Sequence, residues 1–382
     1  MSDKRRFEIA IYLAFFAFIM CAPLVLEPFW LNRIAKYLVF GMLGIAVALS
    51  WGYAGILNLG QGLFFGAGAY MLAMSLKLAS PTSLQQGSDR PVPDFMLWNA
   101  EPGSPTELCS INKASFLWLP FQHQWFGVFM GLVLPAAIAT IIGIIVFRKR
   151  ISGVFVSLIT LALVLLVRLV VIDAQPVTNG FNGLTDLGWF KVGEFEFDPY
   201  IVPTYYFVAI ALCLVLAAAR LLIETRAGLI LQAIRDDQNR ARYLGFDVPL
   251  YQTFFFAVSA GIAGLAGMFY VVVSEFASPT FMDLTFSITM VVWAAVGGRS
   301  SILGACIGAI VINMISATVS ETAGFAEAWK VIIGLIFVLV VLYLPRGLAG
   351  LAHDLLDRFL ARGKAAPSQH AIEASDASQL AE

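Results

Sequence analysis

The sequence predicts an all-α polytopic membrane protein with about ten transmembrane helices, some of them broken or re-entrant, and with both termini in the cytoplasm. Hydrophobic residues make up 59% of the chain and charged residues only 13%, whereas soluble domains contain about 45–50% and about 25%. Apolar stretches of about 20 residues, the length that spans a bilayer as a helix, recur along most of the chain. The net charge of −1 offers no basic surface for nucleic acid.

The first span follows a short cytoplasmic N-terminus, 1–6, which contains three basic residues. The apolar run over 7–26 is long enough to cross a membrane. No small-residue cleavage site of a secretory signal peptide follows it. We therefore interpret this run as a retained first helix.

Further apolar runs complete a predicted transmembrane domain over 7–344. They are 34–50, 56–78, 124–147, 154–172, 201–222, 253–274, 284–296, 302–320 and 328–344. The run over 284–296 is short for a span, so we expect it to be tilted, half-buried or re-entrant. The run over 56–78 contains several glycines and two side-chain amides, so we expect a break there.

Lysine and arginine placement predicts the orientation, because cytoplasmic loops of membrane proteins carry the excess of these residues. Two thirds of the 24 Lys and Arg residues fall on one face. The loops 79–123 and 173–200 then lie in the periplasm, and the loop 223–252 lies in the cytoplasm. The tail, 345–382, is also cytoplasmic, and its polar composition predicts that most of it is disordered.

Signatures of enzymes are missing from the predicted spans. The three histidines, His123, His353 and His370, lie at a membrane edge or in the tail, so no span offers a histidine for nucleophilic catalysis or for zinc. The segment 55–61 has the glycine spacing of a phosphate loop but lacks the Lys and Ser/Thr that bind phosphate and Mg²⁺. We predict no catalytic residue, no metal site and no cofactor in this chain. If ATP drives transport, another chain must bind it.

Polar side chains inside the predicted spans are the candidates for contact with a solute. The candidates are Asn58, Gln61, Ser157, Thr160 and Asn313. Asn58 and Gln61 are three residues apart and therefore share a helix face. Amides and hydroxyls buried in a membrane need hydrogen-bond partners, which a polar solute or a neighbouring helix can supply. Pathway lining and helix packing both stay open as interpretations.

Charged residues near the membrane edges form a second group. Arg168 lies near the outer end of its span, close to Asp173, while Glu275 and Asp283 flank a short outer turn. Charge within a membrane is costly and marks a functional site by default. Near the end of a span, however, an arginine reaches water. A structural ion pair or snorkelling is the first interpretation, and contact with a solute is the second.

The long cytoplasmic loop is dense in Asp and Arg. Asp236 and Asp237 are placed to cap a second short helix, and Gly245 is placed to end it. We expect a short amphipathic helix on the cytoplasmic face, with Ala241 and Leu244 on one side. A solvated connecting loop is the alternative to a docking surface for another protein.

Several stretches resemble the permease subunits of branched-chain amino acid ABC importers. They are Gly52-Tyr-Ala-Gly-Ile-Leu-Asn-Leu-Gly-Gln-Gly62, Asn179-Gly-Phe-Asn-Gly-Leu-Thr-Asp186, Ala233-Ile-Arg-Asp-Asp-Gln-Asn-Arg-Ala241 and Val296-Gly-Gly-Arg-Ser-Ser-Ile-Leu-Gly-Ala305. The resemblance covers roughly 35–350. Within this family the chain is most similar to urea-importer permeases of the UrtC type, through the stretch 153–162, the outer loop around 92–96 and the overall length. Gln61 and Leu161 depart from the histidine and glutamine that the family pattern leads us to expect.

The resemblance implies a machine of several chains in the bacterial inner membrane, surrounded by the lipid bilayer. Its other members are a periplasmic substrate-binding protein, a homologous second permease subunit and two ATPase subunits, which use ATP and Mg²⁺. It further implies that a helix in the long cytoplasmic loop couples to an ATPase subunit. The residues of this coupling helix are Ala233, Ile234, Arg235, Asp236, Asp237, Arg240, Ala241 and Gly245.

We therefore expect half of a translocation pathway for urea that works by alternating access. Import of branched-chain or other amino acids by the same machinery is the alternative, although a zwitterion favours charged partners in the pathway. A stand-alone carrier or channel comes next. A carrier needs carboxylates in mid-membrane, and no predicted span has one there. An intramembrane enzyme is disfavoured by the placement of the histidines.

Overall fold

The computed structural model describes residues 3–80, 93, 95, 117–321, 331, 334, 335, 338, 342 and 347–350. The described residues contain seven helices that are long and apolar enough to cross a membrane. The chain is therefore an all-α polytopic membrane protein. Most of the predicted span 328–344, most of the loop 79–123 and most of the tail 345–382 lie outside the described residues.

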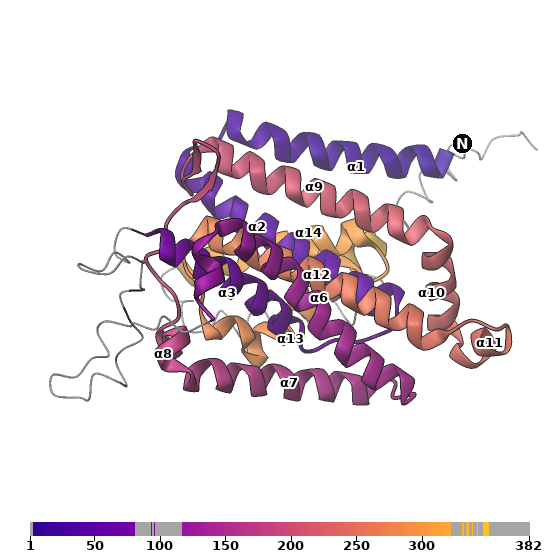
Figure 1. Cartoon of the computed structure of the whole chain (residues 1–382). Helices are drawn as coiled ribbons and strands as arrows, with labels where there is room; N and C mark the ends of the chain where they lie inside the picture. The colour runs from indigo at the N-terminus through magenta and orange to yellow at the C-terminus, as the bar shows by residue number, and fades with distance from the viewer. Residues whose placement is uncertain are drawn as a thin grey trace, which may run out of the picture.

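The helices run side by side along one direction (Figure 1). They are α1 (Asp3–Cys21), α2 (Pro28–Val47), α3 (Gln61–Ala79), α6 (Gln124–Arg148), α7 (Val154–Asp173), α9 (Val202–Glu224), α12 (Val248–Ser274), α13 (Leu284–Gly297) and α14 (Ile302–Glu321). Their apolar sequences match the predicted runs because a helix satisfies its own backbone groups, as a bilayer demands. The deeply buried helices are α2, α3 and α12.

Small residues allow α3 and α12 to pack backbone against backbone. A Cβ atom added at Gly68 would lie 2.1 Å from the carbonyl oxygen of Gly264, and one added at Gly267 would lie 2.0 Å from that of Phe65. Gly264 also lies close to α6, because a Cβ atom added there would lie 2.7 Å from the carbonyl oxygen of Gly131. Close approach at small residues is typical of helix packing in membranes, where van der Waals contact drives association.

The predicted break in the run 56–78 is confirmed. α2 continues as a π-helix, η2 (Ala48–Tyr53), and the chain then follows a non-helical path over 54–60 before α3 begins at Gln61. Gly55 in this segment has a φ of +70°, a conformation that glycine adopts without strain. The N–H and C=O groups of irregular backbone at membrane depth must find hydrogen-bond partners inside the protein.

The short run 284–296 forms a short helix. α13 has 14 residues, and at about 1.5 Å per residue it extends about 20 Å, less than the roughly 30 Å of a hydrocarbon core. The 3₁₀ turn η6 (Pro279–Met282) precedes it. A Cβ at Gly62 would lie 2.6 Å from the carbonyl oxygen of Phe281. The beginning of α13 therefore lies beside the beginning of α3.

The two ends of the bundle differ. At one end, on the right of Figure 1, lie α10 (Arg226–Asp236), α11 (Gln238–Tyr243) and the beginning of α1. We name it the predicted cytoplasmic end. At the predicted periplasmic end lie α8 (Gln175–Thr178), η5 (Gly180–Asn182) and the antiparallel strands β1 (Phe190–Val192) and β2 (Phe195–Phe197), in which Phe190 faces Phe197. The orientation of the bundle in a membrane stays a prediction.

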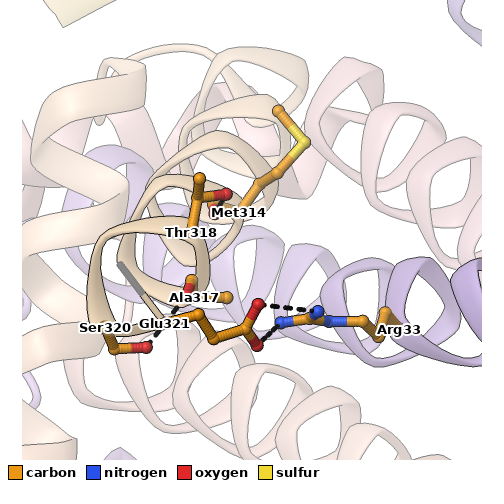
Figure 2. A network of polar contacts seen from close by, with 6 residues as sticks. All are labelled: Arg33, Met314, Ala317, Thr318, Ser320 and Glu321. Carbon is orange, nitrogen blue, oxygen red and sulfur yellow. Dashed lines mark hydrogen bonds and ion pairs between the residues drawn. The ribbon is translucent and has the colours of Figure 1, made fainter. Parts of the chain in front are cut away.

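Side-chain contacts connect α9 to α1 and α2 to α14 at the predicted periplasmic end. The hydroxyl of Tyr205 on α9 donates a hydrogen bond of 2.9 Å to the carbonyl of Ile19 on α1. Figure 2 shows the guanidinium of Arg33 on α2 donating to both carboxylate oxygens of Glu321, the last residue of α14. Arg33 also lies over the rings of Phe29 and Trp30, 5.8 and 5.3 Å from their centroids.

Candidate functional site

Asn58, Gln61, Ser157 and Thr160, four of the predicted pathway residues, lie together around the non-helical segment 54–60. The Asn58 amide Nδ2 donates to Gln61 Oε1 at 2.5 Å, and Asn58 Oδ1 accepts from the backbone N–H of Gly60 at 2.9 Å. The local sequence therefore closes a small hydrogen-bonded turn at the start of α3. Asn58 and Gln61 contact each other, but the predicted shared helix face is wrong, because Asn58 lies in the non-helical segment before α3.

Hydroxyl groups of α7 hold the same segment from the other side. Ser157 Oγ donates to the carbonyl of Leu57 at 2.7 Å. Thr160 Oγ1 accepts from the N–H of Leu59 at 3.2 Å and donates to the carbonyl of Ser157 at 3.0 Å. These bonds replace the backbone hydrogen bonds that the chain gives up where it leaves the helix.

Ser259 of α12 completes the cluster. Gln61 Nε2 donates to its carbonyl at 3.3 Å and to its hydroxyl at 3.2 Å, and Ser259 Oγ donates to the carbonyl of Ala46 at 2.7 Å. Ser259 was not among the predicted pathway residues. The available signal was the run of Ser, Ala and Gly over 259–267, a composition typical of helices that pack closely in membranes.

The cluster is closed to solvent in this conformation. Each of its side chains belongs to a residue that is at most 3% exposed. Hydrogen bonds are made by all four predicted residues of the cluster, Asn58, Gln61, Ser157 and Thr160. The arrangement fits helix packing directly, and pathway lining requires a second conformation that exposes the same groups.

Asn313, the fifth candidate, stands apart from the other four. It is half-buried on α14, and its Nδ2 donates to the carbonyl of Ala309 in the same helix at 2.8 Å. No hydrogen bond among the described residues joins it to the cluster. A polar residue in a span is visible in the sequence, but the helix face on which it packs is not.

The predicted cytoplasmic loop, 223–252, forms two helices instead of one. Thr225 caps α10 by accepting from the N–H of Gly228 at 3.3 Å. Asp237 caps α11, because its Oδ1 accepts from the N–H of Arg240 at 3.0 Å and of Asn239 at 2.9 Å. The bond from the Arg240 N–H, supported by the bond from Asn239 and by the Arg240 charge, holds the pKa of Asp237 below its ordinary value. Gly245, with a φ of +89°, follows the end of α11. The predicted cap and end are confirmed at Asp237 and Gly245.

One expectation for this loop is wrong. Ala241 is 3% exposed and packs against Ile234 and Val248, but Leu244 is 71% exposed and its neighbour Tyr243 is 91% exposed. The difference arises because α11 ends at Tyr243, so that Leu244 leaves the helical face that Ala241 occupies.

The predicted coupling residues divide into a buried and an exposed group. Ile234 and Ala241 face the body of the protein, whereas Ala233, Asp236 and Arg240 are exposed. The exposed group lies beside the exposed apolar side chains of Tyr243 and Leu244.

Arg235 connects α10 to the interior. Its Nη1 donates to the carbonyl of Gly52 in η2 at 2.7 Å, and its Nε and Nη2 donate to Asp236 Oδ1 at 3.2 and 3.0 Å. A Cβ at Gly55 would lie 2.9 Å from Arg235 Cγ. α10 is thus in contact with η2 and with Gly55, near the start of the non-helical segment.

At the predicted periplasmic end, charged residues contact partners that are distant in the sequence. Arg168 lies 3.6 Å from Asp283, not against Asp173. Glu275 accepts a hydrogen bond of 2.7 Å from Trp189 Nε1. An ion pair of Arg168, one of the two interpretations offered by the sequence, is present.

Known proteins resemble the chain over most of its length. The model of the family described as branched-chain amino acid transport system / permease component matches residues 29–341. The permease protein LivM of the high-affinity branched-chain amino acid transport system of Salmonella typhimurium is 24% identical over 81% of this chain and 68% of its own length. The ribose import permease protein RbsC of Escherichia coli is 29% identical over 50% of this chain and 59% of its own length.

A third relative is the probable branched-chain amino acid transport permease protein LivH of Methanocaldococcus jannaschii, 27% identical over 62% of this chain and 79% of its own length. No solved structure matches the chain. The chain spans a little over half the length of the ribose permeases that it matches. Because the family model covers far more than half of the chain, the protein belongs to the family of branched-chain amino acid transport system permease components.

Proposed function

We propose that this protein is the permease subunit of an ABC importer in the bacterial inner membrane, and that it forms half of a pathway for urea by alternating access. The observation that carries the proposal is the composition of the buried cluster around 54–60, which consists of neutral amides, hydroxyls and backbone groups. Urea is neutral and rich in hydrogen-bond donors and acceptors. Groups of the same kind bind it without the desolvation of a buried charge.

The proposal assigns energy supply and delivery to partner chains. Two ATPase subunits bind ATP and Mg²⁺, and one of them receives α10 and α11. Exposed Tyr243 and Leu244, with the charges of Asp236 and Arg240, offer the mixture of apolar and charged contacts that protein interfaces use. A homologous second permease supplies the other half of the pathway, and a periplasmic binding protein delivers the solute.

Uptake of radiolabelled urea tests the assignment. In cells that lack other urea routes, we expect ATP-dependent uptake that is lost when this chain is deleted and regained when it is restored. Uptake that persists after deletion contradicts the urea assignment. Uptake that depends on the chain but survives depletion of ATP identifies a stand-alone carrier or channel instead.

Import of branched-chain amino acids is the second candidate. It is supported by the LivM and LivH relatives, which are named as branched-chain amino acid transport permeases, and by the ion pair of Arg168 and Asp283, whose charges complement a zwitterion. Competition separates the two candidates. Excess unlabelled leucine suppresses labelled uptake only if the machine carries amino acids, and the binding specificity of the periplasmic protein must agree.

A further inference from the structure

We propose that Arg168 and Asp283 form a solute-contact site on the face between α7 and α13, near the predicted periplasmic end. The site binds a small solute that presents a carbonyl or carboxylate oxygen to the guanidinium and N–H donors to the carboxylate. This inference rests on the proposed import function. It names the site at which the imported solute is first bound.

The geometry leaves both charged groups available. Arg168 Nη1 and Asp283 Oδ1 are 3.6 Å apart, and the two side chains are 25% and 38% exposed. Asp283 Oδ1 also caps α13 by accepting from the N–H of Leu284 at 3.0 Å. Within the described residues, Arg168 Nε is buried and has no hydrogen-bond partner. A guanidinium has five donors and a carboxylate has about four acceptor positions, so a bound solute finds unused groups on both.

The surroundings distinguish this face from one that faces lipid. Thr285, in the first turn of α13, is exposed beside the pair. A charged side chain inside a bilayer costs about 2.5 kcal/mol or more, so partly exposed charges within a span favour contact with water or protein. Arg168 is directed at Asp283 on another element, instead of reaching past the end of its own helix into water.

Polar groups continue inward from the pair. Ser287 lies one turn after Asp283 on α13, is fully buried, and its hydroxyl has no hydrogen-bond partner among the described residues. A Cβ at Gly62 would come within 2.7 Å of Ser287 Oγ, so the hydroxyl points at the residue that follows Gln61. A buried hydroxyl without a partner is unfavourable. Asp283 and Ser287 therefore offer a passing solute successive hydrogen bonds toward the start of α3.

Two solutes share the required chemistry. Urea offers its carbonyl to Arg168 and its amide N–H groups to Asp283. An amino acid offers its carboxylate and its ammonium group in the same way. The experiment therefore uses both urea and leucine as probes, and it uses the complete importer with its binding protein, both permeases and both ATPases in proteoliposomes.

The first measurement compares Arg168→Gln and Asp283→Asn with the wild type. Because hydrogen bonds to charged groups contribute about 1.5–3 kcal/mol, we expect uptake of the transported solute to fall by about tenfold or more. Asn retains the ability to cap α13. Asp173→Asn is the matched control, since it removes the same charge from the exposed end of α7, and its uptake stays unchanged.

The second measurement separates solute contact from a structural ion pair. In a background with Cys21→Ser and Cys109→Ser, a membrane-impermeant thiol reagent modifies Thr285→Cys. Saturating urea or leucine, whichever is transported, slows this modification, and adding Asp283→Asn removes the protection. If uptake is normal but neither solute protects Thr285→Cys, the site is refuted and the importer stands. If neither solute is taken up at all, the proposed function fails instead.

Discussion

The Arg235 guanidinium donates a hydrogen bond to the carbonyl of Gly52, 183 positions earlier in the chain, with 2.7 Å between Nη1 and O. Gly52 lies at the end of α2 and its π-helical extension, just before the non-helical segment that holds Asn58. The bond therefore connects the helix pair at the predicted cytoplasmic end with the buried cluster. A displacement of α10 acts directly on the backbone that positions Gln61.

Reversing both charges in Arg235→Glu with Asp236→Arg is expected to uncouple ATP hydrolysis from uptake. The variant loses the charge-assisted bond to Gly52, so uptake falls by about tenfold while hydrolysis and expression persist. Lys149→Glu, an exposed reversal at the same end of the bundle, is the control and leaves uptake unchanged. Normal uptake in the double variant would rule out the coupling role.

Gln61→Met is expected to destabilise the protein, because it removes the acceptor of Asn58 Nδ2 and the donor to Ser259. Leaving a buried polar group without its partner costs about 1–3 kcal/mol, which should lower the melting temperature in detergent. Ser75→Ala is the control: the Ser75 hydroxyl is buried without a partner among the described residues, so its removal breaks no hydrogen bond. Equal melting temperatures for Gln61→Met and the wild type would contradict this account of the cluster.

Gly264→Ala and Gly261→Ala, three positions apart in α12, should have opposite effects. The new Cβ at 264 would lie 2.5 Å from Pro135 Cγ and 2.7 Å from the Gly131 carbonyl oxygen, and overpacking of this kind costs about 1–3 kcal/mol. At 261 the nearest atom lies 3.9 Å away, so alanine is tolerated and gains up to about 1 kcal/mol from its helix propensity. Thermal denaturation followed by size-exclusion fluorescence measures both, and a stable Gly264→Ala protein would refute the packing.

Arg33→Ala should cost more stability than Glu321→Gln, although both break the same ion pair (Figure 2). The Glu321 side chain is 59% exposed, and exposed pairs contribute about 0–1 kcal/mol. Arg33→Ala loses in addition the contacts over Phe29 and Trp30, worth about 0.5–1 kcal/mol each at exposed sites. Chemical denaturation of the two variants gives the comparison, and equal losses would mean that the ring contacts contribute nothing.

Features carried by local sequence were predictable. Hydropathy located α6, α7 and α9 to within two residues of their observed limits, because a spanning helix needs an unbroken apolar run. Glycine and amide residues marked the break before Gln61, and Asp237 and Gly245 acted as cap and stop. These signals depend on neighbours in the chain, which the sequence displays directly.

Features that depend on tertiary packing were not predictable from one sequence. The partner of Arg168 is Asp283, on an element more than a hundred residues away, and hydropathy contains no information about which spans lie side by side. Ser259 was overlooked because serine occurs in many apolar helices, and only the position of Gln61 opposite it gives its hydroxyl a role. Leu244 was placed on the wrong side because the point at which α11 ends could not be read to a single residue.

Contact between the backbones of α3, α6 and α12 has a mechanical consequence. Gly68 brings the backbones of α3 and α12 together at Gly264, and Gly264 in turn approaches the Gly131 carbonyl of α6, so that little side-chain volume separates these backbones to absorb a sliding motion. These three helices should therefore turn as a single rigid block when the protein changes state. Movement between this block and the rest of the protein must then take place at contacts made by long side chains. Two such contacts, at opposite ends of the bundle, are Arg235 with Gly52 and Arg168 with Asp283.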